Sequence, residues 1–420
     1  MKKSILLFLW IFVAAPSWAQ QALTIEQCYE LARQNYPLIH QKDLVAKSKE
    51  FSVANARTGF LPQVSIAGQA TYQSEVTRVP LEVPGFKVDA LSKDQYKIYA
   101  ELNQSIYDGG TVKRQTALQE TNALVEDQKV EVELYRIKER INQIYFGTLL
   151  IDEQKVQAEL IKKDLTSSLA KMESAIRNGT AFKTNADILQ AELLKTDQRI
   201  IELNATKRSY LDMLGLFIHQ EIAENVVLQK PTTVAVSTDS NLARPELTLY
   251  RYQSELITAQ QQLTNTKVLP RVSLFVQGGY GKPGLNMLLN KFDTYYIGGL
   301  RLNWNLGGFY NTKRDKQLLD VNLQSVNYQK EAFLFNTNLT LKQQNNDITK
   351  LNELIAVDEK LIELRTRIKN TAKAQLENGV ITANDYLREL NAEDQAKQNL
   401  ALHQTQLVMT QYNYQVTSGN

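Results

Sequence analysis

The sequence has a single cysteine, Cys28, among its 420 residues, so the chain cannot form a disulfide bond with itself. Its three histidines, His40, His219 and His403, lie far apart in sequence, and none has a carboxylate at a spacing typical of metal ligands. No serine or cysteine nucleophile motif is present. These absences argue against an enzyme, and the sequence indicates no bound metal or other cofactor.

Neither sign of charge dominates the sequence. The chain has 48 basic and 45 acidic residues, which gives a formal net charge of +3, and the basic residues are spread along it. Proteins that bind nucleic acid usually gather lysine and arginine on one face instead. Nucleic acid is therefore not an expected partner.

Long apolar runs are missing as well. Beyond the N-terminus no run reaches 18 apolar residues, whereas a transmembrane helix needs about 20. The N-terminus combines Lys2 and Lys3, an apolar run from Ile5 to Ala15 and a small-residue pattern that ends at Ala19. This predicts a secretory signal peptide over residues 1–19, cleaved after Ala19. A buried apolar N-terminal helix is the alternative.

The sequence repeats itself. Leu61–Ile66 (LPQVSI) recurs 208 residues later as Leu269–Leu274 (LPRVSL), and Asn178-Gly179 recurs 200 residues later as Asn378-Gly379. Two copies of one unit therefore make up the chain, and a variable loop in each absorbs the change of offset. The expected organisation is a first repeat over residues 20–217, a linker over 218–244 and a second repeat over 245–420.

Each repeat changes from a helical to an alternating pattern at a proline. Pro62 and Pro270 mark this helix-to-strand junction, because proline has a fixed φ and no N–H with which to continue a helix. Two stretches per repeat then alternate apolar and polar residues, which predicts strands with one apolar face. The expected strands span residues of about 63–75, 95–107, 271–281 and 293–306.

A glycine pair, Gly109-Gly110 or Gly307-Gly308, follows the second strand of each repeat and lets the backbone turn sharply. The next 67 residues of the first repeat lack proline and contain one glycine, Gly147. An unbroken helix of that length would reach roughly 100 Å. Its narrow apolar stripe, with spacings of three and four residues, is typical of a coiled coil.

Both long helices should end at Asn-Gly, with Gly179 and Gly379 as the stop residues. A shorter helix then returns in each repeat. Its expected caps are Thr184 or Asn185 in the first repeat and Thr382 or Asn384 in the second. Asp187 and Asp385 are placed in the first turn, where a carboxylate suits the helix dipole.

Four strands of about ten residues fit a tilted crossing of an outer membrane. Four strands cannot close a barrel, and open edges are not tolerated in lipid, so several chains must share one. Twelve strands would leave a passage, which makes a trimer the smallest useful assembly. A soluble antiparallel sheet with one face on a core is the alternative.

The duplicated order of helix, Leu-Pro, strand, loop, strand, diglycine, long helix, Asn-Gly and short helix resembles the TolC-type outer-membrane efflux proteins. The resemblance implies a mainly α fold with a membrane β-barrel. A homotrimer would form a 12-stranded barrel and a periplasmic α-helical tunnel, with residues around 218–244 in an equatorial belt.

The resemblance also implies a function in the outer membrane and periplasm. The protein would be the passive export duct of a tripartite efflux or type I secretion system, and would dock a periplasmic adaptor and an inner-membrane transporter. Outer-membrane lipid would surround the barrel. A soluble periplasmic coiled-coil chaperone or adaptor is the alternative function.

In that family the periplasmic tip lies after each Gly of the Asn-Gly turns. Asp385 resembles the carboxylate that narrows the closed entrance, and Asp187 is its counterpart in the first repeat. Arg388 stands where the family has a second acidic residue, one helical turn from Asp385, so the two are expected to pair and to set the closed mouth. The alternative is that Asp385 and Asp187 only cap helices.

Overall fold

The computed structural model describes residues 22–77, 90–233 and 242–419. The predicted signal peptide lies outside these residues. The chain divides into two compact units. A helical unit comprises Met1–Ile39, Leu134–Ala243 and Thr337–Asn420, and a sheet unit comprises His40–Glu133 and Arg244–Asn336. Each unit therefore takes a part of both sequence repeats.

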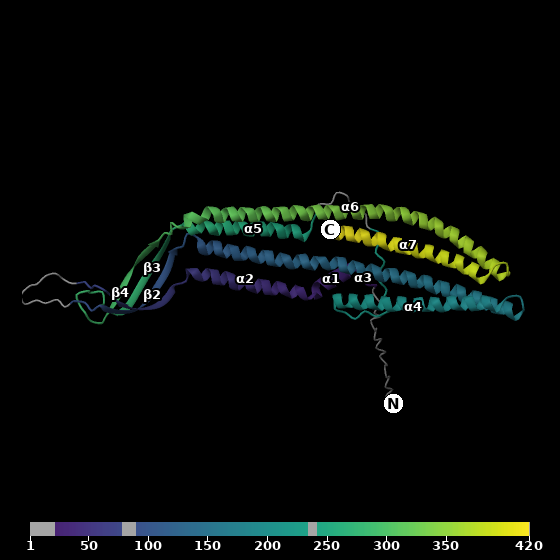
Figure 1. Cartoon of the computed structure of the whole chain (residues 1–420), viewed down its shortest axis with the longest axis horizontal. Helices are drawn as coiled ribbons and strands as arrows, with labels where there is room; N and C mark the ends of the chain where they lie inside the picture. The colour runs from purple at the N-terminus through teal and green to yellow at the C-terminus, as the bar shows by residue number, and fades with distance from the viewer. Residues whose placement is uncertain (1–21, 78–89, 234–241, 420) are drawn as a thin grey trace, which may run out of the picture. The chain divides into compact units, whose positions relative to one another are not determined.

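From the strands onward the two repeats have the same order of elements, whereas two helices precede the strands of the first repeat and one precedes those of the second (Figure 1). The first contains α1 (Ile25–Asn35), α2 (Gln41–Arg57), β1 (Gln63–Tyr72), β2 (Asp94–Tyr107), α3 (Thr111–Arg177) and α4 (Lys183–Ile218). The second contains α5 (Pro245–Asn265), β3 (Arg271–Lys282), β4 (Asp293–Asn303), α6 (Gly308–Glu377) and α7 (Ala383–Ser418). Short 3-10 turns are η1 (Pro37–His40), η2 (Thr58–Phe60) and η3 (Thr266–Val268). The predicted long and short helices of both repeats are confirmed.

The helical unit consists of paired antiparallel helices. Figure 1 shows α4 beside α3 and α7 beside α6, and the ion pairs Lys162–Asp197 and Arg365–Glu389 join the members of each pair. The predicted narrow seam of α3 is buried within this unit, as the residues Leu134, Ile137, Ile141 and Ile144 show. Burial of this stripe stabilises the pairing of helices whose remaining surface is polar.

α1 begins with a capping box. The Thr24 hydroxyl accepts a hydrogen bond from the backbone N–H of Gln27, whose side chain accepts one from the backbone N–H of Thr24. Cys28 is fully buried on this helix, where it packs as a small apolar residue. Burial, aided by the nearby Glu26, raises the pKa of its thiol to about 12, so the thiol stays protonated.

The linker forms no strand at Val226–Gln229. Leu228 instead makes a single parallel bridge to Leu23. The Tyr145 hydroxyl donates to the carbonyls of Leu23 and Gln229, at 2.8 and 2.7 Å. The Leu23 carbonyl also accepts from the backbone N–H of Gln229 at 3.1 Å, so a side chain of α3 reinforces this short bridge.

The sheet unit contains one antiparallel sheet in the order β1-β2-β3-β4. Its central pairing, β2 with β3, joins the two repeats, for example through Leu102 opposite Val276. The register places the alternating apolar residues of all four strands on one face, because neighbours such as Val64 and Leu102 lie directly opposite. This face is exposed: Ile66 and Leu300 keep 76% and 70% of their surface.

The strands differ from the predicted spans at their ends. β1 stops at Tyr72 rather than near 75, and β4 stops at Asn303 rather than near 306. The Asn305 side chain accepts a hydrogen bond from the backbone N–H of Gly307 at 3.1 Å. This local turn competes with the strand ladder and ends β4 early.

The glycine pairs after β2 and β4 differ from each other. Gly109 and Gly110 have φ of 67° and 79°, which other residues rarely adopt. Gly307 and Gly308 lie outside that region, and Gly308 is the first residue of α6. A Cβ on Gly308 would lie 2.9 Å from the carbonyl oxygen of Lys267. The expected left-handed turn is therefore present in the first repeat, whereas the second repeat needs glycine for a close approach.

Within the described ranges, no helix combines the length and apolar character required to cross a membrane.

Candidate functional site at the Asn-Gly turns

Both long helices of the helical unit end in the same left-handed turn. Gly179 and Gly379 have φ of 72° and 73°. At the first turn, Gly179 donates to the Ile176 carbonyl and Thr180 to the Ala175 carbonyl. The second turn repeats this pattern two hundred residues later, at Gly379 and Val380. This is a Schellman motif, in which glycine lets the chain reverse while the last helical carbonyls stay paired.

The two return helices begin differently. α7 has the capping box of Thr382 and Asp385, which confirms Thr382 as a cap and places Asp385 in the first turn. α4 begins at Lys183, and Phe182 at its N-cap makes no side-chain capping bond. The predicted caps Thr184 and Asn185 are therefore wrong, because both residues lie inside the helix. Asp187 is an exposed residue beyond the first turn of α4, not within it.

Asp385 is held mainly by the residue that precedes its helix. Its carboxylate accepts hydrogen bonds from the Thr382 hydroxyl at 2.7 Å and from the Thr382 backbone N–H at 3.2 Å. These bonds, with a smaller contribution from the Arg388 charge, lower the pKa of the Asp385 carboxyl. The Arg388 guanidinium lies 3.9 Å from Asp385 but 3.1 Å from Glu389. Glu389 is thus a closer partner for Arg388.

The side chains behind the turns form an apolar cluster that includes all four helices. Tyr386 is fully buried at its centre. The buried members of the cluster are Leu165, Met172, Leu189, Ala372, Leu376, Ala383, Tyr386, Leu387 and Leu390. The turns are also joined directly, since the Ala383 backbone N–H donates to the Asn185 side chain at 3.4 Å.

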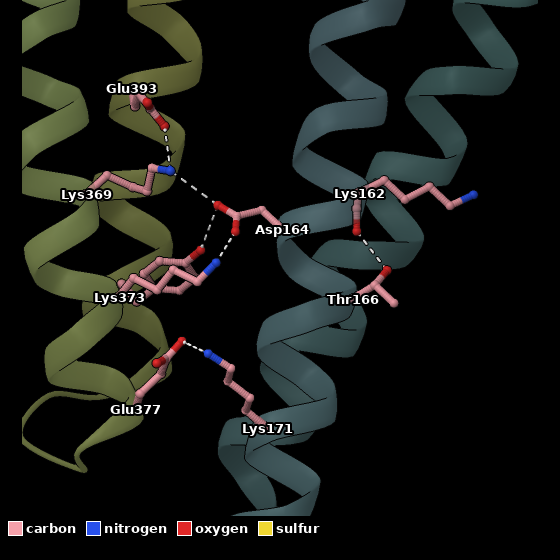
Figure 2. A network of polar contacts seen from close by, with 9 residues as sticks. Lys162, Asp164, Thr166, Lys171, Lys369, Lys373, Glu377 and Glu393 are labelled. Carbon is pink, nitrogen blue, oxygen red and sulfur yellow. Dashed lines mark hydrogen bonds and ion pairs between the residues drawn. The ribbon is translucent and has the colours of Figure 1, made fainter.

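A network of charges lies next to this cluster and joins the two repeats. Figure 2 shows Asp164 of α3 reaching between Lys369 and Lys373 of α6. The Asp164 carboxylate accepts hydrogen bonds from both ammonium groups, that from Lys369 at 3.3 Å. The Tyr386 hydroxyl donates to the same carboxylate at 3.4 Å. Asp164 therefore connects α3 to both α6 and α7.

Glu393 of α7 extends the network. It lies 3.3 Å from Lys369 and 2.9 Å from Lys397, and it accepts a hydrogen bond from the Thr366 hydroxyl at 2.8 Å. Glu393 is only 4% exposed. A carboxylate so buried must be compensated by charge and hydrogen bonds, which these three partners supply.

Charge compensation outweighs burial at both carboxylates. Burial raises the pKa of Asp164, but the Lys373 hydrogen bond and the two lysine charges bring it below its usual value. The pKa of Glu393 is lowered in the same way, chiefly by the hydrogen bonds from Lys397 and Thr366. Burial raises the pKa of the Tyr386 hydroxyl, which stays protonated and able to donate. Both carboxylates are therefore ionised near neutral pH.

More exposed ion pairs flank the network. Lys171 of α3 pairs with Glu377 of α6 at 2.7 Å (Figure 2). Arg199 of α4 pairs with Asp394 of α7 at 2.9 Å. Asp394 is the more buried partner of that pair, with a side chain 10% exposed. These contacts add two further links between the repeats.

No sequence motif singles out Asp164, Lys369, Lys373, Tyr386 or Glu393. One signal was available, because Asp164 precedes the seam residue Leu165, and Lys369 and Lys373 are spaced by one helical turn. A charged residue beside a seam position is a candidate for a contact between helices. That spacing does not indicate which residues, about 200 positions away in the sequence, are the partners of Asp164.

In the sheet unit, Pro62 and Pro270 lie one residue before β1 and β3. The residue before each proline is extended, with ψ of 151° at Leu61 and 144° at Leu269. Each short 3-10 turn therefore ends where the strand conformation begins, as expected for the residue before a proline.

The polar face of the sheet has an ion pair that crosses β3. Arg301 of β4 donates to Glu101 of β2 at 2.7 and 3.3 Å. The Arg301 guanidinium also lies 4.4 Å from the ring centre of Phe275 on β3. A bidentate pair stacked on a ring has one well-defined geometry. The sheet thus has an exposed apolar face and an ordered polar face.

Among the residues that the structure describes, no cluster of three or more histidine, cysteine or acidic side chains is placed to hold a metal ion.

Known proteins match this architecture. Residues 28–212 match the model of the outer membrane efflux protein family. The structure resembles the outer membrane protein VceC of Vibrio cholerae with a TM-score of 0.68 at 14% identity, covering 94% of this chain and 96% of that one. The comparison with curated proteins finds no match.

Two further solved structures are similar. The CmeC outer membrane channel of Campylobacter jejuni gives a TM-score of 0.66 at 13% identity over 94% of this chain and 85% of that one. The MtrE outer membrane channel of Neisseria gonorrhoeae, solved in its open state, gives 0.66 at 12% identity over 94% and 89%. At these identities the likeness shows the fold.

Duplicated helical hairpins joined to a four-stranded sheet with an exposed apolar face define an outer-membrane channel fold. Residues 28–212 match the model of the outer membrane efflux protein family, and the solved channels share the fold over 94% of the chain. The predicted resemblance and the predicted fold of hairpins and strands are confirmed. This is a family of channels rather than of enzymes.

Proposed function

We propose that the protein is the outer-membrane duct of a tripartite efflux or type I secretion system, through which substrates pass without chemical change. The observation that carries the proposal is the two-faced sheet. Its apolar face is exposed at Ile66 and Leu300, while its other face holds the Arg301–Glu101 ion pair. Such a sheet suits a wall between lipid and water.

One chain supplies four strands, and β1 and β4 are the ends of the sheet. An open edge leaves backbone groups unpaired, which costs several kcal/mol per group in lipid. Three chains, with β4 of each paired to β1 of the next, would close a twelve-stranded barrel. The long helices would then form the periplasmic tunnel, with residues 218–244 in its equatorial belt. The proposed location requires export, with the signal peptide cleaved after Ala19.

The Asn-Gly turns would form the periplasmic tip, where an adaptor and an inner-membrane transporter dock. Three Asp385 carboxylates around a threefold axis would concentrate negative charge and favour cations at the mouth. Gly179 and Gly379 would set the shape of the tip, with Asp187 on its first-repeat side. Arg388 would partly neutralise Asp385, from which it lies 3.9 Å. The pair would thereby set the closed mouth.

Cell fractionation tests the assembly and location. We expect the mature protein, beginning at Gln20, in the outer-membrane fraction, and a trimer on gels that dissociates on heating. Release into the soluble periplasmic fraction would instead support the alternative of a periplasmic coiled-coil chaperone or adaptor, and would reject the duct.

Conductance in planar bilayers tests the mouth. The Asp385→Ala channel should differ from the unmodified channel in conductance and should be less blocked by multivalent cations. Lys171→Ala, on α3 near the first Asn-Gly turn, is the control change of one charged residue. Unchanged conductance and unchanged block in Asp385→Ala would reject the role of this carboxylate, while leaving the duct itself intact.

A further inference from the structure

The loop between β3 and β4 is unusually apolar for an exposed turn. Four of its residues, Leu285, Met287, Leu288 and Leu289, keep between 42% and 60% of their surface exposed. Loops are normally polar, and a run of exposed apolar residues in one indicates a function. This loop therefore presents an apolar surface whose exposure to water is unfavourable.

The loop has a defined conformation. The Asn286 side chain accepts a hydrogen bond from the Leu288 backbone N–H at 3.0 Å, and its carbonyl accepts one from the Leu289 N–H at 3.2 Å. The Asn290 side chain accepts hydrogen bonds from the backbone N–H and the hydroxyl of Ser92, just before β2. The apolar residues are thus presented by an ordered turn that is fastened to the neighbouring hairpin.

The end of the loop lies against the apolar face of the sheet. The Phe292 ring stacks on Tyr280 of β3, with centres 5.4 Å apart, and on Tyr96 of β2, with centres 6.3 Å apart. Tyr280 lies opposite Ile98, so these rings share the face that carries the exposed aliphatic residues. The apolar surface of the sheet therefore continues into the loop through Phe292.

The surrounding residues fit the boundary between lipid and water. Four tyrosines of the apolar face lie at the loop end of the strands: Tyr72, Tyr96, Tyr280 and Tyr296. Tyrosines in such a band mark the level of the lipid headgroups. Lys282 precedes the loop and Lys291 lies near its end. Lysine can extend its ammonium group to the headgroups while its stem stays in apolar surroundings.

We propose that the β3–β4 loop, Leu285–Phe292, is a lipid anchor that inserts its apolar side chains into the interface of the outer membrane. The inference rests on the proposed function, because it takes the exposed apolar face of the sheet to be the lipid-facing face. A lipid layer that covers the loop explains why its leucines are exposed in an ordered turn. It also explains why the apolar surface of the sheet continues into the loop through Phe292.

Tryptophan fluorescence in brominated phosphatidylcholine vesicles tests the anchor. The background is Trp304→Phe, because no other tryptophan follows the predicted signal peptide. Leu288→Trp reports on the loop, and Met287→Trp is a second reporter should the first fail to assemble. Tyr296→Trp and Tyr295→Trp are neighbouring controls, since Tyr296 lies on the apolar face and Tyr295 on the polar face.

We expect bromine near the headgroup end of the acyl chain to quench the fluorescence of Leu288→Trp and Tyr296→Trp but not that of Tyr295→Trp. Aqueous iodide should quench the loop tryptophan only slightly. Quenching of the loop tryptophan by iodide but not by bromolipid would reject the anchor. Quenching of that tryptophan by neither agent would also reject it, and would indicate that a second copy of the chain covers the loop. Quenching of Tyr296→Trp in those two cases would leave the duct supported. Bromolipid quenching of neither Tyr296→Trp nor Leu288→Trp would reject the duct as well.

Discussion

The Lys369 ammonium on α6 lies 3.3 Å from a carboxylate oxygen of Asp164 on α3, although 205 residues separate the two in the sequence. Lys373 donates to the other oxygen of the same carboxylate. The contact joins the long helix of one repeat to the long helix of the other. In this contact the first repeat contributes the carboxylate and the second contributes the two ammonium groups, so the charge of Asp164 is compensated by the other repeat.

Removing the Asp164 carboxylate should loosen the helical unit near the turns. In Asp164→Ala, Lys373 loses its partner and Lys369 keeps only Glu393. Hydrogen bonds to charged groups contribute about 1.5–3 kcal/mol, so we expect the free energy of local opening to fall by about 2 kcal/mol. Hydrogen exchange at residues 160–175 and 365–393 measures this change.

Lys171→Ala is the matched control for that experiment. Lys171 also joins α3 to α6, but its side chain is 56% exposed and its partner Glu377 lies at the surface of the unit. Exposed pairs contribute less than about 1 kcal/mol. Equal effects of the two substitutions would contradict the special position of Asp164.

Acid should weaken the same region. The folded structure lowers the pKa of Asp164 and of Glu393. A lowered pKa in the folded state gives stability that is fully present above the unfolded-state pKa, about 4, and is lost as the pH falls through the folded-state value. The ratio of exchange rates between Asp164→Asn and the unmodified chain measures this contribution at each pH. We expect a constant ratio above about pH 5 that approaches one in stronger acid. A ratio independent of pH would show that the charge of Asp164 does not matter.

The second turn needs glycine at position 379 for its backbone conformation and not because a side chain would clash there. Gly379 has φ of 73°, and nothing lies within 4 Å of the position that a Cβ would take. Gly379→Ala should therefore destabilise the hairpin through backbone strain alone, by about 1–2 kcal/mol. Gly379→Asn is the control and should cost less, because asparagine tolerates this conformation. Chemical denaturation, monitored by hydrogen exchange in α7, compares the stability of the helical unit in the two variants. An equal loss in both would indicate a steric cause.

The prolines before the strands should matter for assembly. Pro62→Ala with Pro270→Ala removes the residues that keep Leu61 and Leu269 extended, so helix can extend into the start of β1 and β3. We expect less heat-stable trimer on gels. Pro245→Ala is the control, because Pro245 is the first residue of α5, a position where proline is replaceable. Unchanged amounts of trimer in the double variant would contradict the role of these junctions.

Local rules predicted the elements near the turns well where the signal was a backbone requirement. Gly179 and Gly379 adopt the expected left-handed conformation, and Thr382 forms the expected cap. The prediction failed at α4, where Phe182 precedes the helix without a capping side chain. The Asn185 side chain is instead used across the turn, where it accepts from the Ala383 N–H. A tertiary contact thus replaced the local one.

The sequence by itself determined the repeat, the order of helices and strands, and the face of each strand that is apolar. These follow from proline and glycine chemistry and from residue spacing, which act within a few neighbours along the chain. The tertiary structure alone decided which distant residues meet. It explains Gly147, the one glycine within α3, because a Cβ there would lie 2.8 Å from the ring of Tyr210 on α4. It also brings Asp164 to two lysines of the other repeat and Phe292 to the apolar face of the sheet. Such pairings depend on how helices and strands pack, and no periodic pattern in the local sequence indicates them.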